Sequence, residues 1–177
     1  MITPETKSWT WVLETACPDC GLDTPTVPRT RIPALTRANV AAWHELLVSG
    51  GDELRIRPEP DTWAPIEYAC HVRDVFGMFD ERLRLMLADN APDFPNWDQD
   101  ATAVESRYAE QDPVRVAGEL AAAGATLADA FAAVAEDQWS RTGRRSDGTV
   151  FTVESLARYF IHDPVHHLWD VTGTRAA

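Results

Sequence analysis

Positive charge is scarce in this sequence. Its 177 residues include 16 lysines and arginines against 28 aspartates and glutamates, which gives a formal net charge of −12. A surface that binds nucleic acid needs clustered cations to neutralise phosphates. The one basic cluster, Arg141 to Arg145, lies in a glycine-containing loop that we interpret as a solvated turn. The composition therefore argues against a nucleic-acid partner.

Long apolar runs are also missing. No stretch approaches the roughly 20 apolar residues that a helix needs to cross a bilayer. The first residues do not show a basic region followed by an apolar one, so we expect neither a membrane anchor nor a signal peptide. We expect a cytoplasmic protein with three reduced cysteines, in which Cys17 and Cys20 are thiols or metal ligands rather than a disulfide.

Convincing strand pairs are absent too, and helical periodicity replaces them. Residues 1–32 are rich in proline and threonine without a sustained period, which predicts an irregular N-terminal arm, and residues 33–177 predict one helical domain. Apolar side chains recur there every three to four residues, the pattern of helices with one buried face. The predicted helices cover residues 33–49, 65–88, 113–135 and 152–169, with a short one near 103–108.

The helix boundaries carry recognisable start and stop signals. Gly50-Gly51 ends the first helix. We expect Asp61 or Thr62 to cap the second helix, with Pro65 in its first turn, and Thr152 to cap the last. About 24 residues join the second and third helices, enough to run back along the bundle, so these two helices could be parallel. The sequence thus predicts an all-α four-helix bundle.

Three histidines are the strongest sign of chemistry. His71 lies at the edge of the apolar stripe of the second predicted helix, and His162 and His166 are spaced by four on the last one. That spacing places two imidazoles on one helical face. A third imidazole from a facing helix would complete a metal site with one open position, as in catalytic centres. The alternative is that these histidines only cap carbonyls or face solvent.

Pro164 lies between the two spaced histidines. A proline inside a helix removes a backbone hydrogen bond and costs about 3 kcal/mol or more. Its presence indicates that local geometry outweighs helix stability here, unless the helix restarts at this residue. His167 adjoins His166 but points roughly 100° away, so we do not assign it to the same ion.

Four carboxylates could accept a hydrogen bond from the second ring nitrogen of a ligating histidine. Glu67 and Asp74 lie near the histidine of the second helix, and Asp163 and Asp170 flank the pair on the last one. A carboxylate on the second ring nitrogen fixes the tautomer of a ligating histidine. Each of the four could equally be an exposed side chain of an acidic protein.

Cys17-Pro-Asp-Cys20-Gly21 resembles half of a zinc knuckle. Two thiolates need two further ligands, and the sequence has no second Cys-x-x-Cys. Cys70 and His44 are candidates in principle, and a site shared between two subunits is another solution. A reduced turn packed under the arm is the simpler interpretation. The pair is therefore a candidate second metal or redox site.

Trp63–His71 and Ile161–Asp170 are the segments that resemble the DinB superfamily, and the resemblance extends over roughly residues 33–172. This family includes thiol-dependent transferases that use bacillithiol or mycothiol, and the N-terminal domain of mycothiol-dependent maleylpyruvate isomerase. The resemblance implies a bundle, often dimeric, in which the three histidines hold zinc, nickel or iron. The isomerase branch has a carboxylate in place of one histidine, and this set does not, which weakens an isomerase assignment.

Two functions remain open at this stage. The first is a metal-dependent thiol S-transferase or hydrolase, acting on a small molecule as a homodimer, with zinc as the preferred metal and a mycothiol-like thiol. Metal coordination would favour the thiolate of a bound thiol, or lower the pKa of bound water to about 7. The second is a non-enzymatic metal-binding module for stress response or interaction. A sealed ion with four protein ligands would favour that second function.

Overall fold

A computed structural model describes residues 8–176 of the chain. Four long helices form a bundle, as predicted: α1 (Ile32–Ser49), α2 (Pro65–Ala88), α4 (Pro113–Ala132) and α5 (Val153–Thr172). A short helix, α3 (Gln99–Glu105), lies between α2 and α4. Single 3-10 turns occur at η1 (Thr10–Leu13), η2 (Thr24–Thr26), η3 (Arg29–Arg31), η4 (Asp52–Arg55), η5 (Tyr108–Glu110) and η6 (Glu136–Gln138).

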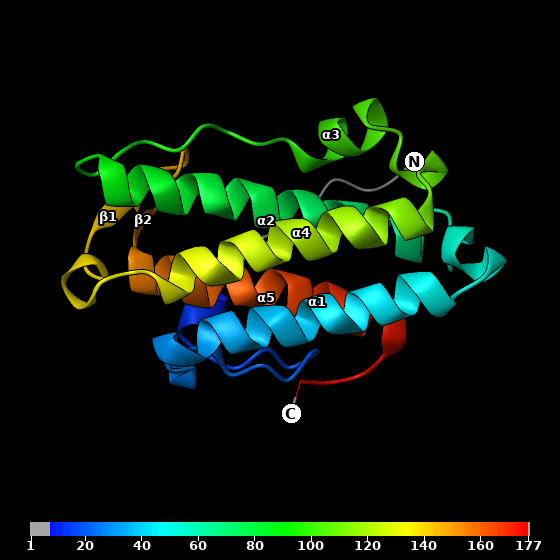
Figure 1. The fold of residues 1–177 in the computed structure, drawn as a ribbon, viewed down its shortest axis with the longest axis horizontal. Helices are drawn as coiled ribbons and strands as arrows, with labels where there is room; N and C mark the ends of the chain where they lie inside the picture. The colour runs from blue at the N-terminus through cyan, green and yellow to red at the C-terminus, as the bar shows by residue number, and fades with distance from the viewer. Residues whose placement is uncertain (1–7, 177) are drawn as a thin grey trace.

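The bundle has an uncommon order of helix directions. α2 and α4 run parallel to each other and antiparallel to α1 and α5 (Figure 1). The connection over residues 89–112 makes this possible, because it travels back along the outside of α2 before α4 begins (Figure 1). Near its start, the N–H of Phe94 donates to the carbonyl of Arg144 at 2.7 Å. The parallel arrangement that this connection allows is the one observed.

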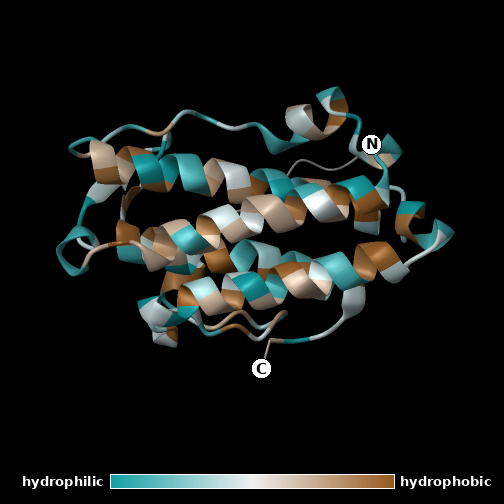
Figure 2. Ribbon diagram, viewed as in Figure 1, coloured by the Kyte–Doolittle hydropathy of each residue, from teal (hydrophilic) through white to brown (hydrophobic). Residues whose placement is uncertain are grey.

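The core fills the space between the four helices. Its largest fully buried side chains include Trp43, Phe76, Phe131 and Phe160, one from each long helix. Apolar and polar residues alternate around each helix, as the brown and teal bands of Figure 2 show. Among the described residues, no helix combines the length and apolar character needed to span a membrane.

The start of α2 differs from the prediction. Neither Asp61 nor Thr62 caps the helix. Glu67 takes this role instead, because its carboxylate reaches back and accepts the N–H of Ala64 at 2.8 Å. The same carboxylate also accepts from Nε of Arg57 at 2.7 Å. An ion pair between exposed Arg57 and buried Glu67 therefore fixes the first turn of the helix that carries His71.

α5 continues unbroken through Pro164, so the helix does not restart there. The proline has no N–H to give to the carbonyl of Phe160, one turn earlier. Its own carbonyl accepts from Nδ2 of Asn39 at 2.8 Å and from Nε1 of Trp43 at 3.3 Å, both on α1. The turn of α5 between the two histidines is thus tied to α1.

A short hairpin precedes α5, and the sequence did not predict it. β1 (Thr142–Arg144) and β2 (Val150–Thr152) pair antiparallel, with Gly143 opposite Phe151. Each strand has three residues, too few to show alternation, and Gly148 adopts φ +89° in the turn. The expectation of no strand pair was therefore wrong. At the end of the hairpin, the hydroxyl of Thr152 caps α5, as expected, by accepting the N–H of Ser155 at 3.0 Å.

Candidate metal centres

α5 presents histidine and aspartate side chains, candidate metal ligands, on two adjacent stripes. His162 and His166 form one pair with a spacing of four, and Asp163 and His167 form the next. Members of a pair share a helical face, whereas neighbouring residues are rotated by about 100°. The first pair therefore faces the N-terminal arm and the second faces α2, where His71 lies. The structure thus brings two of the three predicted histidines together and places His71 in a separate cluster.

The histidine–aspartate cluster consists of His71, Asp163 and His167, whose candidate ligand atoms all lie within 4.8 Å of one another. Oδ1 of Asp163 is 3.6 Å from Nε2 of His71 and 3.9 Å from Nε2 of His167. Burial alone would raise the pKa of Asp163, but the charges of His167 and His71 lower it to about 2. The cluster therefore holds an ionised carboxylate between two imidazoles.

A pocket of about 350 Å³ opens beside this cluster. Asp163 and His167 form part of its wall, and they are partly exposed, whereas His71 is buried behind them. His162 and His166, from the other stripe of α5, also line this pocket. Aromatic rings and acidic groups make up most of the remaining wall: Trp9, Trp63, Tyr68, Tyr159, Asp61, Asp100 and Asp170. A volume of this size suits a small organic ligand.

Two tryptophans hold the ring of His71. Trp97, from the connection that runs along α2, stacks on it with centroids 5.3 Å apart and planes 18° apart. Trp63, just before α2, lies 5.3 Å away on a tilted plane. These contacts fix the orientation of the imidazole. The connection over residues 89–112 therefore covers His71 with the aromatic ring of Trp97.

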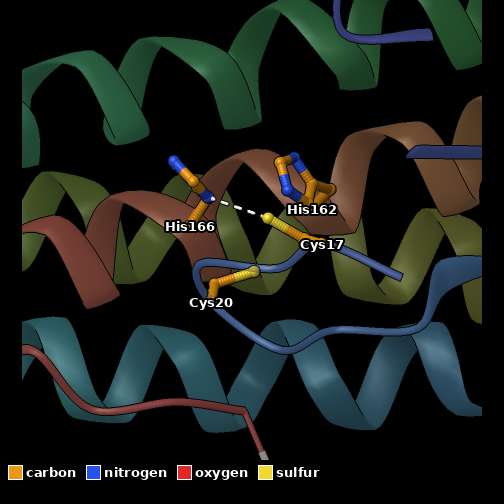
Figure 3. Close-up of side chains that lie close together, drawn as sticks. All are labelled: Cys17, Cys20, His162 and His166. Carbon is orange, nitrogen blue, oxygen red and sulfur yellow. Dashed lines mark hydrogen bonds between the residues drawn. The ribbon is translucent and has the colours of Figure 1, made fainter. Parts of the chain in front are cut away.

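The cysteine–histidine cluster consists of Cys17 and Cys20 from the N-terminal arm and His162 and His166 from α5 (Figure 3). All four are buried, and their candidate ligand atoms lie within 4.8 Å of one another. Sγ of Cys17 is 3.5 Å from Nδ1 of His166. The cysteines are free thiols rather than a disulfide, and burial raises the pKa of Cys20 to about 12. Burial, reinforced by His166, lowers the pKa of His162 to about 4.

Asp170 contacts a histidine of each cluster. Its Oδ2 is 2.9 Å from Nδ1 of His167, and its Oδ1 is 3.7 Å from Nε2 of His166. The other nitrogen of each ring faces the cluster: Nε2 of His167 lies toward Asp163, and Nδ1 of His166 lies toward Cys17. Asp170 therefore lies where a carboxylate orients ligating histidines.

The other predicted carboxylates have different roles. Glu67 is engaged by Arg57 at the start of α2. Asp74 accepts the hydroxyl of Tyr108 and Nε of Arg73, the latter at 2.8 Å. Asp163 lies among the candidate ligand atoms instead of behind them.

The comparisons with known proteins agree with this fold. The family model of the DinB superfamily matches residues 34–171, which is most of the chain. The chain belongs to the DinB superfamily. A solved structure of YfiT from Bacillus subtilis superposes with a TM-score of 0.75 at 18% sequence identity, covering 82% of this chain and 84% of the other. YfiT is described as a probable metal-dependent hydrolase with an unusual four-helix bundle topology. No curated protein matches the sequence.

Buried polar atoms in this DinB chain fit divalent metal ions. Both ring nitrogens of His71, Nε2 of His162 and Oδ1 of Asp163 are buried, and none has a hydrogen-bond partner among the described residues. Each unsatisfied group of this kind costs about 1–3 kcal/mol. Two imidazoles with a carboxylate, and two imidazoles with two thiols, are donor sets that bind zinc.

The candidates named for Cys17 and Cys20 from sequence lie elsewhere in this DinB chain. Sγ of Cys70 is buried and donates to the carbonyl of Tyr108 at 3.9 Å, and His44 is exposed on α1. Sequence reasoning missed that the partners are the two spaced histidines of α5. It also treated Asp163 only as a supporting carboxylate and assigned His167 to no ion, although their spacing of four was a usable signal for a second pair.

Proposed function

We propose that this protein is a metal-dependent enzyme with the histidine–aspartate cluster as its active centre. Its substrate would be a small electrophilic molecule, with a low-molecular-weight thiol as co-substrate. The observation that carries this proposal is the meeting of three ligand atoms, from α2 and α5, beside a pocket. Three protein ligands leave a coordination position for a reactant, whereas the four of the cysteine–histidine cluster leave none. Zinc suits the donor set best, with nickel and iron as alternatives.

A bound divalent ion lowers the pKa of a thiol or a water at its open position, which supplies the nucleophile. The chain would contribute the surroundings. Asp170 holds Nδ1 of His167, so that Nε2 of this ring faces the cluster. Burial, with the charges of Asp170 and Glu67, raises the pKa of Tyr68 to about 12. The Tyr68 hydroxyl therefore stays protonated on the pocket wall, where it can donate to negative charge that develops on the electrophile.

The charge of the pocket narrows the substrate class. Asp61, Asp100, Asp163 and Asp170 line it, and no lysine or arginine is among the described lining residues. An anionic substrate would be repelled by these carboxylates, so neutral or cationic molecules are favoured.

An isomerase is the second candidate, because one observation supports it. Asp163 provides a carboxylate among the candidate ligands. This removes the argument against the isomerase branch, which rested on three histidines. The acidic pocket nevertheless disfavours a dicarboxylate such as maleylpyruvate, and we therefore prefer thiol transfer or hydrolysis.

The test measures turnover of zinc-loaded protein with three substrates. These are chlorodinitrobenzene with mycothiol, para-nitrophenyl acetate without thiol, and maleylpyruvate with mycothiol. We expect turnover of a neutral substrate, reduced at least about 100-fold by His71→Ala or Asp163→Asn. His44→Ala, on the exposed face of α1, is the matched control and should behave as wild type. Turnover of maleylpyruvate alone would identify the isomerase, and no turnover with the cluster loaded would favour the non-enzymatic module.

A further inference from the structure

We propose that Cys17, Cys20, His162 and His166 bind a second, structural zinc ion that fastens the N-terminal arm to α5. This site is separate from the proposed active centre and does not depend on its function. It uses a side of α5 that the histidine–aspartate cluster leaves free.

The geometry is close to that of a tetrahedral site. With zinc–sulfur bonds near 2.3 Å and zinc–nitrogen bonds near 2.0–2.1 Å, neighbouring ligand atoms lie about 3.3–3.8 Å apart. The 3.5 Å between Sγ of Cys17 and Nδ1 of His166 already falls in this range. All four atoms lie within 4.8 Å of one another, so binding requires a contraction of at most about 1.5 Å.

The turn that carries the cysteines is shaped like a knuckle. The N–H of Gly21 donates to the carbonyl of Cys17 at 3.0 Å, and the N–H of Cys17 donates to the carbonyl of Leu22 at 2.9 Å. Gly21 adopts φ +82°, which strains other residues. The turn points both thiols at α5 (Figure 3). Ala176 packs against the outer side of this turn, where its N–H donates to the carbonyl of Cys20 at 2.7 Å.

Burial and charge favour an ion at this position. Cys17 and Cys20 are 1% and 0% exposed, and His162 and His166 are 3% and 7% exposed. Two thiolates and two neutral imidazoles balance the double positive charge of zinc, so the loaded site carries no net charge into the interior. The sulfur ligands exclude magnesium and calcium. Nε2 of His162 also has no hydrogen-bond partner among the described residues.

The ion would act on the pocket through the arm. Trp9 lies on the arm, with its ring centroid 5.3 Å from that of His162 and 4.9 Å from that of His166. The same ring lines the pocket. Fastening the arm would therefore place one aromatic wall of the pocket.

The first test is zinc X-ray absorption on the His71→Ala/Asp163→Asn variant, which removes the other cluster. We expect one equivalent of zinc per chain, with two sulfur and two nitrogen neighbours. A shell of nitrogen and oxygen only, or no bound zinc after reloading, would overturn the proposal. The result is independent of activity, which this variant should lack if the proposed active centre is correct.

The second test compares cobalt-loaded variants. Cobalt bound by thiolates has a charge-transfer absorption that sites with only nitrogen and oxygen ligands do not show. We expect Cys17→Ser and Cys20→Ser each to remove this absorption and one equivalent of metal. Cys70→Ser, at the other buried cysteine, should keep both. Helical circular dichroism checks that each variant is folded. If the Cys17 and Cys20 variants fail to fold, the zinc X-ray absorption experiment on the His71→Ala/Asp163→Asn variant decides. Retention of the band in both variants would refute the site.

Discussion

Asp170 is the residue through which the two clusters meet, because each of its oxygens faces a different histidine. We predict that Asp170→Asn lowers metal affinity about 10–100-fold, since the amide is a weaker acceptor for the ring N–H of a ligating histidine. Competition titration with a chromophoric chelator measures this. Asp137→Asn, at an exposed aspartate of η6 that belongs to neither cluster, serves as the control. Unchanged affinity in both variants would show that Asp170 is only a surface neighbour.

The individual residues of the site were only partly predictable from sequence. The spacing of four indicated that His162 and His166 share a face, and the rotation between neighbouring residues indicated that His167 is turned away from them; the structure shows both. The same rule applied to Asp163 and His167. The prediction grouped His71 with His162 and His166, whereas in the structure the candidate ligand atoms nearest to His71 belong to Asp163 and His167. A residue one step along a helix is displaced by about 100°, and sequence alone does not say which stripe faces which neighbour.

At the scale of elements, the helices were predictable because each has a periodic apolar stripe and clear ends. The hairpin β1–β2 was not, since its strands are three residues long. The meeting of the arm with α5 was not predictable either. It depends on tertiary packing between segments at opposite ends of the chain, which leaves no periodic or local signal.

The close approach of α4 to α1 gives a test of the packing. A Cβ on Gly124 would lie 2.2 Å from Cγ2 of Val40, whereas one on Gly118 would meet nothing within 4 Å. We predict that Gly124→Ala lowers the free energy of unfolding by about 1–3 kcal/mol through overpacking. Gly118→Ala, in the same helix, should raise it by up to about 1 kcal/mol, because alanine favours helix. Urea denaturation of the two variants measures both changes, and a stabilised Gly124→Ala would contradict this description of the interface.

At the scale of the whole molecule, metal binding should raise the thermal stability of the folded protein. An ion that binds only the folded state at 100 times its dissociation constant adds about 2.7 kcal/mol. For a chain of this size, removing that contribution lowers Tm by about 5–10 °C. We therefore predict that a strong chelator lowers the Tm of His71→Ala protein, which keeps the cysteine–histidine cluster. In Cys20→Ser protein the chelator should have a smaller effect than in wild type. An equal shift in both variants and wild type would contradict the assignment.

The contact between Cys17 and His166 spans 149 positions of the chain. Closing a loop of that length costs about 4 kcal/mol of chain entropy in the unfolded ensemble. Long-range closures of this kind form slowly, after local helices. During synthesis the segment with Cys17 and Cys20 leaves the ribosome long before His162 and His166 are made, so the two thiols stay without these partners until α5 has emerged and packed. We therefore expect the contact between the arm and α5 to form late in folding.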